Sequence, residues 1–148
     1  MEINSSAPIV SRQGITINAP IEAVWKLHTE VAGWPDWNSD IVRAALNGPV
    51  ATGTVFHWET LGLAISSTIG EVVPLRKLAW SGVAGDVLGI HVWTFSSDKE
   101  GTHVFTEESL EGPSLPEHHE DLQRALDDSL VRWLGSLRDR AEDPDLYR

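Results

Sequence analysis

The stretch SLPEHHEDLQRALDDSLVRWLGSLRDR, residues 114–140, decides the fold because it predicts one long helix late in the chain. Leucine and tryptophan recur in it every three or four residues and form an apolar stripe, which requires an apolar surface to cover it. Ser114 followed by Glu117 has the pattern of a capping box, so we expect the helix to begin there and to reach about Arg140. At 1.5 Å per residue such a helix is about 40 Å long and crosses a whole sheet. The stripe comprises Leu122, Leu126, Leu130, Trp133, Leu134 and Leu137.

Six strand-like segments precede this helix, and each is followed by a turn signal made of Gly, Pro, Asn or Asp. Their spacing is that of β-hairpins, so we expect an antiparallel meander. The expected strands are residues 41–46, 54–60, 63–73, 76–81, 90–96 and 102–110.

The first part of the chain adds one more strand and two short helices. Alternating β-branched residues over 9–18 predict a strand that Pro20 ends. Apolar residues from Ile21 to His28 then recur at helical spacing, and Trp34 and Trp37 would share one face of a second, smaller helix. The fold class is therefore α+β: a curved antiparallel seven-stranded sheet wrapped on the long C-terminal helix, with two short helices after the first strand.

Length and composition limit the classes of function. The 148 residues suit a single domain, 1–148, with a core of about 9–140 and loose tails at both ends. A net charge of −11 repels phosphate groups, so no nucleic-acid partner is expected. The absence of cysteine excludes disulfides and thiolate chemistry, and the longest weakly charged stretch, residues 60–69, is too short to insert in a membrane. No leader segment is recognisable, which favours a cytoplasmic protein.

Seven tryptophans stand out against a single Met and a single Tyr. Each indole offers a broad, rigid apolar face with one N–H that needs a partner when buried. The seven rings either simply fill the core or form the walls of a pocket. A strongly curved sheet cannot close fully onto a straight helix, and this geometry favours a pocket between the two.

Several motifs of the chain resemble the START-related helix-grip superfamily (SRPBCC), in particular its bacterial polyketide cyclase/dehydrase-like branch. The resemblance covers about residues 9–140 and rests on INAPIEAVW (17–25), WPDWN (34–38), GTVF (53–56), VPLRKLAW (73–80), GTHV (101–104) and EESLEG (107–112). These motifs mark turns and packing, so they are specific for the helix-grip fold and weak for function. The branch contains cyclases, lyase-like enzymes and hydrophobic-ligand carriers. The resemblance therefore implies either a cofactor-free cyclase or dehydratase, or a non-catalytic carrier.

Glu108 is the leading candidate for chemistry. Residues 104, 106, 108 and 110 alternate with 103, 105, 107 and 109, and the resemblance favours the first set as inward-facing. A carboxyl in an apolar cavity has a raised pKa, which suits general acid/base catalysis. We therefore expect Glu108 to act as a general base on a proton next to a carbonyl. If the register slips by one residue, Glu108 faces solvent instead, and a buried structural carboxyl is the other alternative.

His91 is the best partner for Glu108, since imidazole titrates near neutrality and neighbouring antiparallel strands can bring the two together. His91, Trp93 and Phe95 share one face of their strand, although Ile90, Val92 and Thr94 could equally be the inner set. A buried, hydrogen-bonded structural histidine is the alternative. His91 or a nearby indole N–H would stabilise the developing enolate oxygen.

The ligand is expected to be a small hydrophobic, partly oxygenated molecule, bound by a monomer or homodimer. The expected ligand-binding residues are Trp37, Phe56, Trp58, Ser67, Trp93, Leu126, Leu130 and Trp133. No metal site is expected, because His118 and His119 are consecutive at a helix start and point in different directions. The aromatase/cyclases of the family tend to hold substrate oxygens with Tyr, Arg and Ser. Here the only Tyr is Tyr147 and the only candidate interior Arg is Arg43, which favours a carrier or an enzyme for a smaller apolar substrate.

Overall fold

The computed structural model describes residues 1–148 and contains the predicted order of elements. The strands are β1 (Ile9–Ile17), β2 (Ile41–Leu46), β3 (Val55–Thr60), β4 (Leu63–Val73), β5 (Lys77–Ala84), β6 (Val87–Asp98) and β7 (Gly101–Glu111). The helices are α1 (Ile21–Thr29), the 3₁₀ turn η1 (Val31–Asp36), the long α2 (Glu120–Ala141) and a second 3₁₀ turn, η2 (Pro144–Tyr147).

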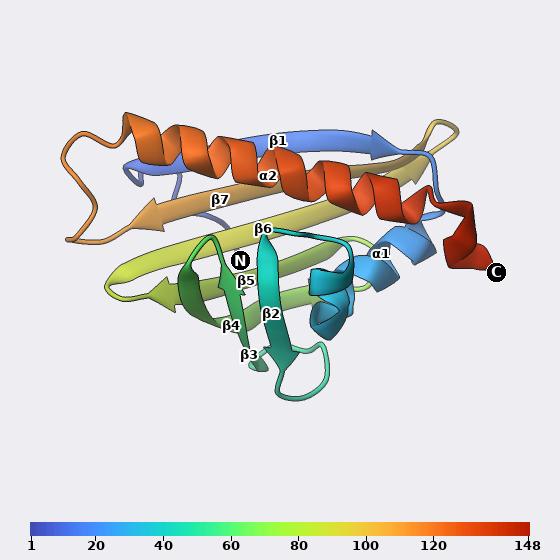
Figure 1. Ribbon diagram of the computed structural model, residues 1–148, viewed down its shortest axis with the longest axis horizontal. Helices are drawn as coiled ribbons and strands as arrows, with labels where there is room; N and C mark the ends of the chain where they lie inside the picture. Colours follow the sequence, from blue (N-terminus) through green and yellow to red (C-terminus); the bar gives the residue numbers. More distant parts are fainter.

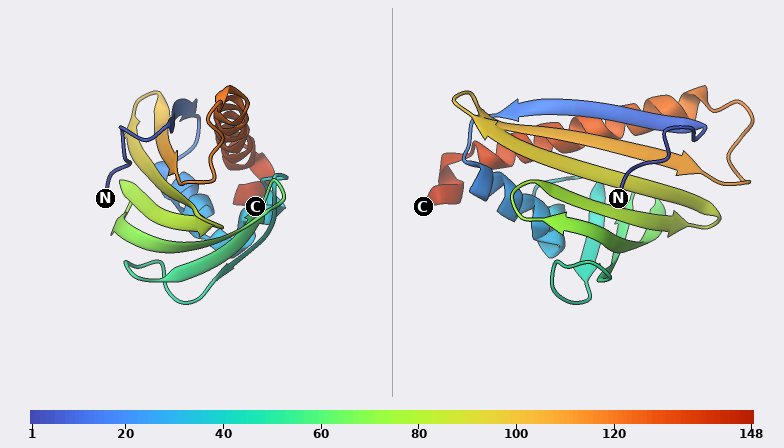
Figure 2. Two further views of the ribbon diagram at one scale, coloured as in Figure 1. Left: turned by 90° about the vertical axis from the view of Figure 1, so that its left-hand side faces the viewer. Right: turned by 180° about the vertical axis from the view of Figure 1, so that it is seen from behind.

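All seven strands form one antiparallel sheet in the order β1-β7-β6-β5-β4-β3-β2. The first strand therefore pairs with the last, and the meander continues from there to the β2 edge. Two register shifts, between Ile41 and Arg43 and between Ile69 and Glu71, increase the local twist. Seen end-on, the sheet curls from β1 and β7 around to β3 and β2, and α2 lies on the open side of this curve (Figure 1 and Figure 2).

Helix α2 packs tightly at one end only. Leu134 and Leu137, in its C-terminal half, are fully buried, whereas Leu122 and Leu126, in its N-terminal half, are only partly buried. The apolar stripe is therefore covered by the core at one end and borders a cavity at the other. This wedge-like arrangement follows from laying a straight helix against a curved sheet.

The predicted start of the long helix is wrong. The helix begins at Glu120, and the residue before it, His119, provides no side-chain cap. The hydroxyl of Ser114 instead donates a hydrogen bond to Asp86 in the β5–β6 turn. Residues 112–119, which contain Pro113 and Pro116, therefore form a loop, and His118 and His119 precede the helix rather than lying on its first turn.

The buried end of the interior is an aromatic cluster around His28 of α1. The His28 ring lies 4.1 Å from Trp93 and 6.0 Å from Trp133, between ring centroids. Trp34 of η1 stacks on it and donates its indole N–H to the His28 carbonyl at 2.9 Å. Five of the seven tryptophans are buried core residues, and three of these five, Trp58, Trp80 and Trp133, also line a cavity, so both alternatives for this residue type occur.

The residues before β1, expected to be a loose tail, are tied to the sheet. The backbone N–H of Asn4 donates to Ser109 Oγ at 3.0 Å, and the Asn4 side chain donates to Glu111 at 3.0 Å. This covers the outer face of β7 at Ser109, which is why that outward residue is buried. At the other end, Tyr147 donates its hydroxyl hydrogen to the Ala141 carbonyl.

Candidate functional site

An internal cavity of about 380 Å³ lies between the N-terminal half of α2 and the concave face of the sheet. This volume is near the lower end of the range for ligand pockets. Strands β3 to β7 form its floor, and the loop at residues 114–116 forms part of its wall. The lining is mostly apolar, and its polar members are Asn38, Asp40, Thr60, Ser67, His91, Glu108, Ser114 and Ser129.

Strand alternation places the predicted inward side chains on the concave face. Trp58 of β3 and Glu108 of β7 both line the cavity, whereas their neighbours His57 and Glu107 do not. On β6 the inner set is the one that contains His91, which resolves the alternative left open by the sequence. The register also pairs His91 directly with Glu108 across β6 and β7. The two predicted catalytic residues are thus neighbours in the cavity floor.

Glu108 is a carboxyl group in an apolar setting. Its side chain is 16% exposed, and burial raises its pKa from 4.5 to about 8. No Lys or Arg lines the cavity to stabilise the ionised form. Glu108 is therefore a neutral acid at pH 7 and can donate a hydrogen bond, in addition to accepting a proton once it has ionised.

His91 lies behind Glu108 and is held by Thr106. Its Nδ1 lies 3.6 Å from Glu108 Oε2, and its Nε2 lies 2.8 Å from Thr106 Oγ1. Burial, and secondarily the nearby His28, lowers the pKa of His91 well below its usual value. The imidazole is therefore neutral. His91 borders the cavity but is only 1% exposed, against 16% for Glu108, so the carboxyl is the more accessible of the two groups.

Two further contacts shape the cavity. The indole N–H of Trp58 donates to Ser67 Oγ at 3.0 Å, so the predicted hydroxyl of Ser67 is present in the lining but is already engaged by a neighbour. At the rim, Arg132 of α2 donates to Asp40, which follows η1, at 2.9 Å. This ion pair ties the helix to the β2 edge. Arg43, the other arginine considered from sequence, is exposed and pairs with Glu59 at 3.9 Å.

Three of the predicted lining residues lie elsewhere, which corrects the sequence-based assignment. Trp93 is sealed in the core next to His28, and Phe56 is buried beneath Trp34 and Trp80. Trp37 ends η1 with φ −131°, so it leaves the helical turn and packs against the outer part of the core. All three are apolar and near the predicted site, but the curvature of the sheet closes the interior around them. Trp58, Ser67, Leu126, Leu130 and Trp133 do line the cavity.

Other lining residues were not predicted. Trp80 of β5 lies on the same face of its strand as Leu78 and Gly82. Alternation predicts this face, but the curvature of the neighbouring strands decides that Trp80 borders the cavity. Thr106 does not line the cavity but holds a lining residue, His91; it was in the inward set and received no role, because His91 lies two positions away across the register. Asp40 and the loop at 114–116 reach the cavity only through the tertiary fold.

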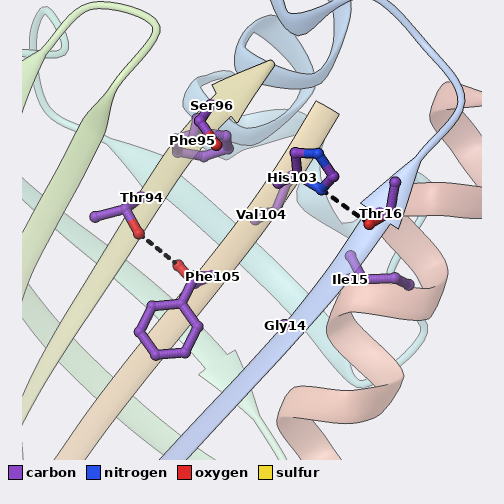
Figure 3. Close-up of a pocket in the computed structure, with 9 residues that line it drawn as sticks. All are labelled: Gly14, Ile15, Thr16, Thr94, Phe95, Ser96, His103, Val104 and Phe105. Atoms are coloured by element: carbon purple, nitrogen blue, oxygen red, sulfur yellow. Dashed lines mark hydrogen bonds between the residues drawn. The ribbon is translucent and has the colours of Figure 1, made fainter. Parts of the chain in front are cut away.

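A second, shallow hollow lies on the outer face of the sheet, where Gly14 leaves space beside Phe105 (Figure 3). His103 borders it and lies near Asp98 and Glu100, so these three side chains could together approach a cation. However, the two ring nitrogens of His103 already contact Thr16 at 2.9 Å and Asp98 at 2.8 Å. The deeper, mostly apolar cavity under α2 is therefore the better candidate site.

Known protein families and solved structures agree with this architecture. The sequence profile of the family described as polyketide cyclase / dehydrase and lipid transport matches residues 8–142. No curated protein is similar enough to match the chain. No helix combines the length and apolar character needed to cross a membrane.

Solved structures with the same fold share little sequence with the chain. A hypothetical protein, jhp0584, from Helicobacter pylori has a TM-score of 0.80 at 17% identity, with 95% of this chain and 92% of that chain covered. A START superfamily protein from Mycobacterium smegmatis has a TM-score of 0.76 at 11% identity, with 90% and 97% covered. The di-domain ARO/CYC BexL of the BE-7585A biosynthetic pathway has a TM-score of 0.76 at 18% identity, with 91% of this chain and 50% of that chain covered. At such low identity these likenesses show the fold, and the predicted helix-grip fold is confirmed.

Proposed function

The chain belongs to the polyketide cyclase / dehydrase and lipid transport family of the START-related helix-grip superfamily, and on that premise we propose that it catalyses a cyclisation or dehydration. The substrate is an uncharged, mostly apolar small molecule that carries a carbonyl group. Glu108 is the acid/base, and the cavity under α2 is the site. The observation that carries this proposal is the isolated carboxyl of Glu108 in an apolar cavity, where burial raises its pKa to about 8.

The charges around the cavity support an uncharged ligand. The lining contains Glu108 and Asp40 but no Lys or Arg, and Arg132 at the rim is already paired with Asp40. A ligand carboxylate or phosphate would lose its hydration without gaining a counter-ion, which is strongly unfavourable. The indole faces of Trp58, Trp80 and Trp133 suit a flat, apolar body instead.

The raised pKa lets the Glu108 carboxyl act first as a base that removes a proton and then as an acid that returns it. With a pKa of about 8, about a tenth of Glu108 is ionised at pH 7, enough to provide a base form. The carboxylate takes a proton from the carbon next to the substrate carbonyl. The electron pair of that C–H bond forms a C=C bond, and the π pair of the carbonyl moves to its oxygen to give an enolate. The carbanion equivalent then attacks a second carbonyl carbon. The neutral carboxyl returns its proton to the resulting alkoxide, or to a departing hydroxyl group that leaves as water.

Trp133 is the proposed donor to the enolate oxygen. Its ring lines the cavity and its indole N–H has no hydrogen-bond partner within the protein. A buried donor without a partner costs about 1–3 kcal/mol, and a ligand oxygen that accepted the hydrogen bond would remove this penalty. The sequence left two donors open, His91 or a nearby indole N–H, and we favour the indole because His91 is only 1% exposed.

A simple ketone tests the proton-abstraction step without knowledge of the natural substrate. 2-Tetralone is apolar, uncharged and has exchangeable hydrogens next to its carbonyl. We expect it to quench tryptophan fluorescence, and we expect its α-hydrogens to exchange in D₂O faster with the protein than with buffer. Glu108→Gln should slow exchange by about 10²–10⁴-fold, the usual contribution of a positioned acid/base, with binding nearly unchanged.

Glu107→Gln is the matched control. Glu107 is the next residue of the same strand, points away from the cavity and lies 3.8 Å from Arg12, so its substitution should leave exchange unchanged. If Glu108→Gln exchanges as fast as the unsubstituted protein, Glu108 is not the base. A carboxylate analogue, 2-naphthoate, should bind at least about tenfold more weakly than 2-tetralone, which corresponds to 1.4 kcal/mol.

A hydrophobic-ligand carrier is the second candidate function. It is favoured by one observation: apart from Asp40, which is held by Arg132, Glu108 is the sole carboxyl facing the cavity, and His91 is shielded behind it. A carrier would bind 2-tetralone with the same fluorescence change and would show no exchange above the buffer rate. The same pair of measurements therefore separates the two functions.

A further inference from the structure

Thr106 is a buried hydroxyl residue that no step of the proposed reaction uses directly. It lies on β7 two residues before Glu108, on the same face of the strand, and is 0% exposed. Its cross-strand partner is Trp93, so it reaches His91 diagonally, with 2.8 Å between Thr106 Oγ1 and His91 Nε2. A chain of three side chains therefore runs from the cavity surface inward: Glu108, His91 and Thr106.

We propose that Thr106 is a positioning residue that fixes the His91 tautomer: its hydroxyl oxygen accepts the Nε2–H hydrogen bond and leaves Nδ1 as a bare acceptor facing Glu108. This inference rests on the proposed function, in which Glu108 is the acid/base. It assigns to Thr106 the orientation of the group that supports that carboxyl.

The distances favour this arrangement. The contact at Nε2 is a full hydrogen bond, whereas Nδ1 has no partner and lies 3.6 Å from Glu108 Oε2. The ring is therefore anchored at one nitrogen only, and the other nitrogen is left for the carboxyl. Hydrogen bonds of this kind are often long in a ligand-free site and shorten when a ligand is bound.

The protonation states agree with the geometry. A neutral imidazole has one donor and one acceptor nitrogen. Because burial keeps Glu108 protonated and His91 neutral at pH 7, a bare Nδ1 is complementary to the O–H of the carboxyl. The opposite tautomer would leave the O–H of the carboxyl without this acceptor. Three other titratable groups face this pair and could change its protonation: Asp40, Asp127 and His28. Asp40 lies at the rim of the cavity, and His28 is neutral. Asp127 of α2 accepts a hydrogen bond from Ser11, the β1 residue that pairs with Glu108.

Removing the hydroxyl of Thr106 should change the tautomer of His91, and through it the pKa of Glu108, in a defined direction. In Thr106→Val, Nε2–H loses its acceptor, and the imidazole gains Nδ1–H, which favours the carboxylate over the neutral acid. We expect the ¹⁵N shifts of the His91 ring to report this change of tautomer. We expect the pKa of Glu108, followed by ¹³C NMR, to fall by about 0.5–1 unit, since a hydrogen bond worth about 1 kcal/mol corresponds to about 0.7 unit. Thr106→Ser retains the hydroxyl and should restore both values.

Thr102→Val is the matched control. Thr102 is on the same strand, is equally buried and donates its hydroxyl hydrogen to the Ala19 carbonyl at 2.7 Å, far along the strand from Glu108. Its loss should destabilise the fold without moving the His91 tautomer or the Glu108 titration. The proposal is overturned if Thr106→Val leaves both signals unchanged, or if Thr102→Val shifts them equally.

These signals are measured in the ligand-free protein, so their outcome is independent of catalysis. If the tautomer and titration respond as expected but the unsubstituted protein does not exchange 2-tetralone protons, the proposed function fails and the positioning role remains. If exchange occurs and the NMR signals do not respond, Glu108 works without Thr106. Should the valine variant not fold, Thr106→Ala removes the same hydroxyl and should show the same two changes.

Discussion

His28 and His91 are both buried histidines, and both ring systems pack against Trp93 and Trp133, yet their nitrogens meet different surroundings. His28 lies in the sealed end of the interior, where neither nitrogen has a hydrogen-bond partner. His91 lies at the cavity end, anchored by Thr106 and facing Glu108. Burial lowers the pKa of both, to about 3 for His28.

Burial and a shifted pKa therefore do not by themselves identify a functional histidine. The difference lies in what surrounds each ring: aromatic faces on every side of His28, and a second titratable group open to a cavity beside His91. The sealed end provides stability and fixes α1 against the sheet. The cavity end gives up some packing and holds a carboxyl in an unfavourable environment, which is typical of a functional site.

The largest expected difference between the two ends concerns the leucine stripe of α2. Leu137→Ala, in the sealed end, should lower the free energy of unfolding by about 2–5 kcal/mol, because it leaves a void among closely packed side chains. Leu126→Ala, at the cavity, removes a side chain that is already partly exposed and should lower it by about 1 kcal/mol or less. Urea denaturation of the two variants measures both values.

For the same two variants, the effect on ligand affinity should have the opposite order from the effect on stability. Leu126→Ala enlarges the cavity and should change the affinity for 2-tetralone, whereas Leu137→Ala should bind it normally while folded. Equal losses of stability in the two variants would mean that α2 packs uniformly along its length, contrary to the wedge-like arrangement.

The second expected effect is a gain of stability on removing the carboxyl at the cavity end. Glu108 has a pKa of about 8 when folded and about 4.5 when unfolded, so its contribution to stability is lost as the pH rises from 4.5 to 8. Glu108→Gln cannot ionise and should be more stable than the unsubstituted protein by about 4 kcal/mol at pH 8, with little difference at pH 4.

Thermal unfolding across this pH range checks the prediction. The control Glu107→Gln, whose side chain shares its strand but faces outward, should stay within about 0.5 kcal/mol of the unsubstituted protein at both pH values. A variant Glu108→Gln that is less stable at pH 8 would show that the carboxylate is held by contacts that favour its charged form.

Much of this architecture could be predicted from sequence, because strand alternation and turn residues act locally. Period-two alternation divided β7 into two sets of residues, and the family resemblance selected the set with Glu108 as the inward one. Hairpin spacing allowed His91 and Glu108 to be neighbours, and the register pairs them directly. The strand ends differed by at most a few residues, as at β6, which extends over Val87–Asp98. Such features depend on neighbours in the chain.

The errors arose where distant segments compete for the same group. Ser114 has the sequence pattern of a helix cap, but Asp86 in another turn takes its hydroxyl, so the helix starts later. Phe56, Trp37 and Trp93 are apolar residues of the type that could line a cavity. The curvature of the sheet assigns Phe56 and Trp93 to the core, and the end of η1 directs Trp37 against its outer part. Sequence patterns give the face of a strand that points inward, but not which inward residues remain uncovered.

The smallest expected effect tests the sealed end through His28. The unfolded chain binds a proton at this residue below pH 6.5, whereas the folded protein does so only near pH 3, so the free energy of unfolding falls as the pH is lowered through this window. At pH 5 this loss is about 2 kcal/mol relative to pH 7.5. His28→Leu has similar volume, gives up no hydrogen bond at either ring nitrogen, and removes this titration. Urea denaturation at the two pH values should therefore show a loss on acidification that is about 2 kcal/mol smaller in the variant, with exchange of 2-tetralone at pH 7.5 unaffected. An identical loss in both proteins would mean that His28 is protonated inside the aromatic cluster, and a loss of exchange would mean that the two ends of the interior are coupled.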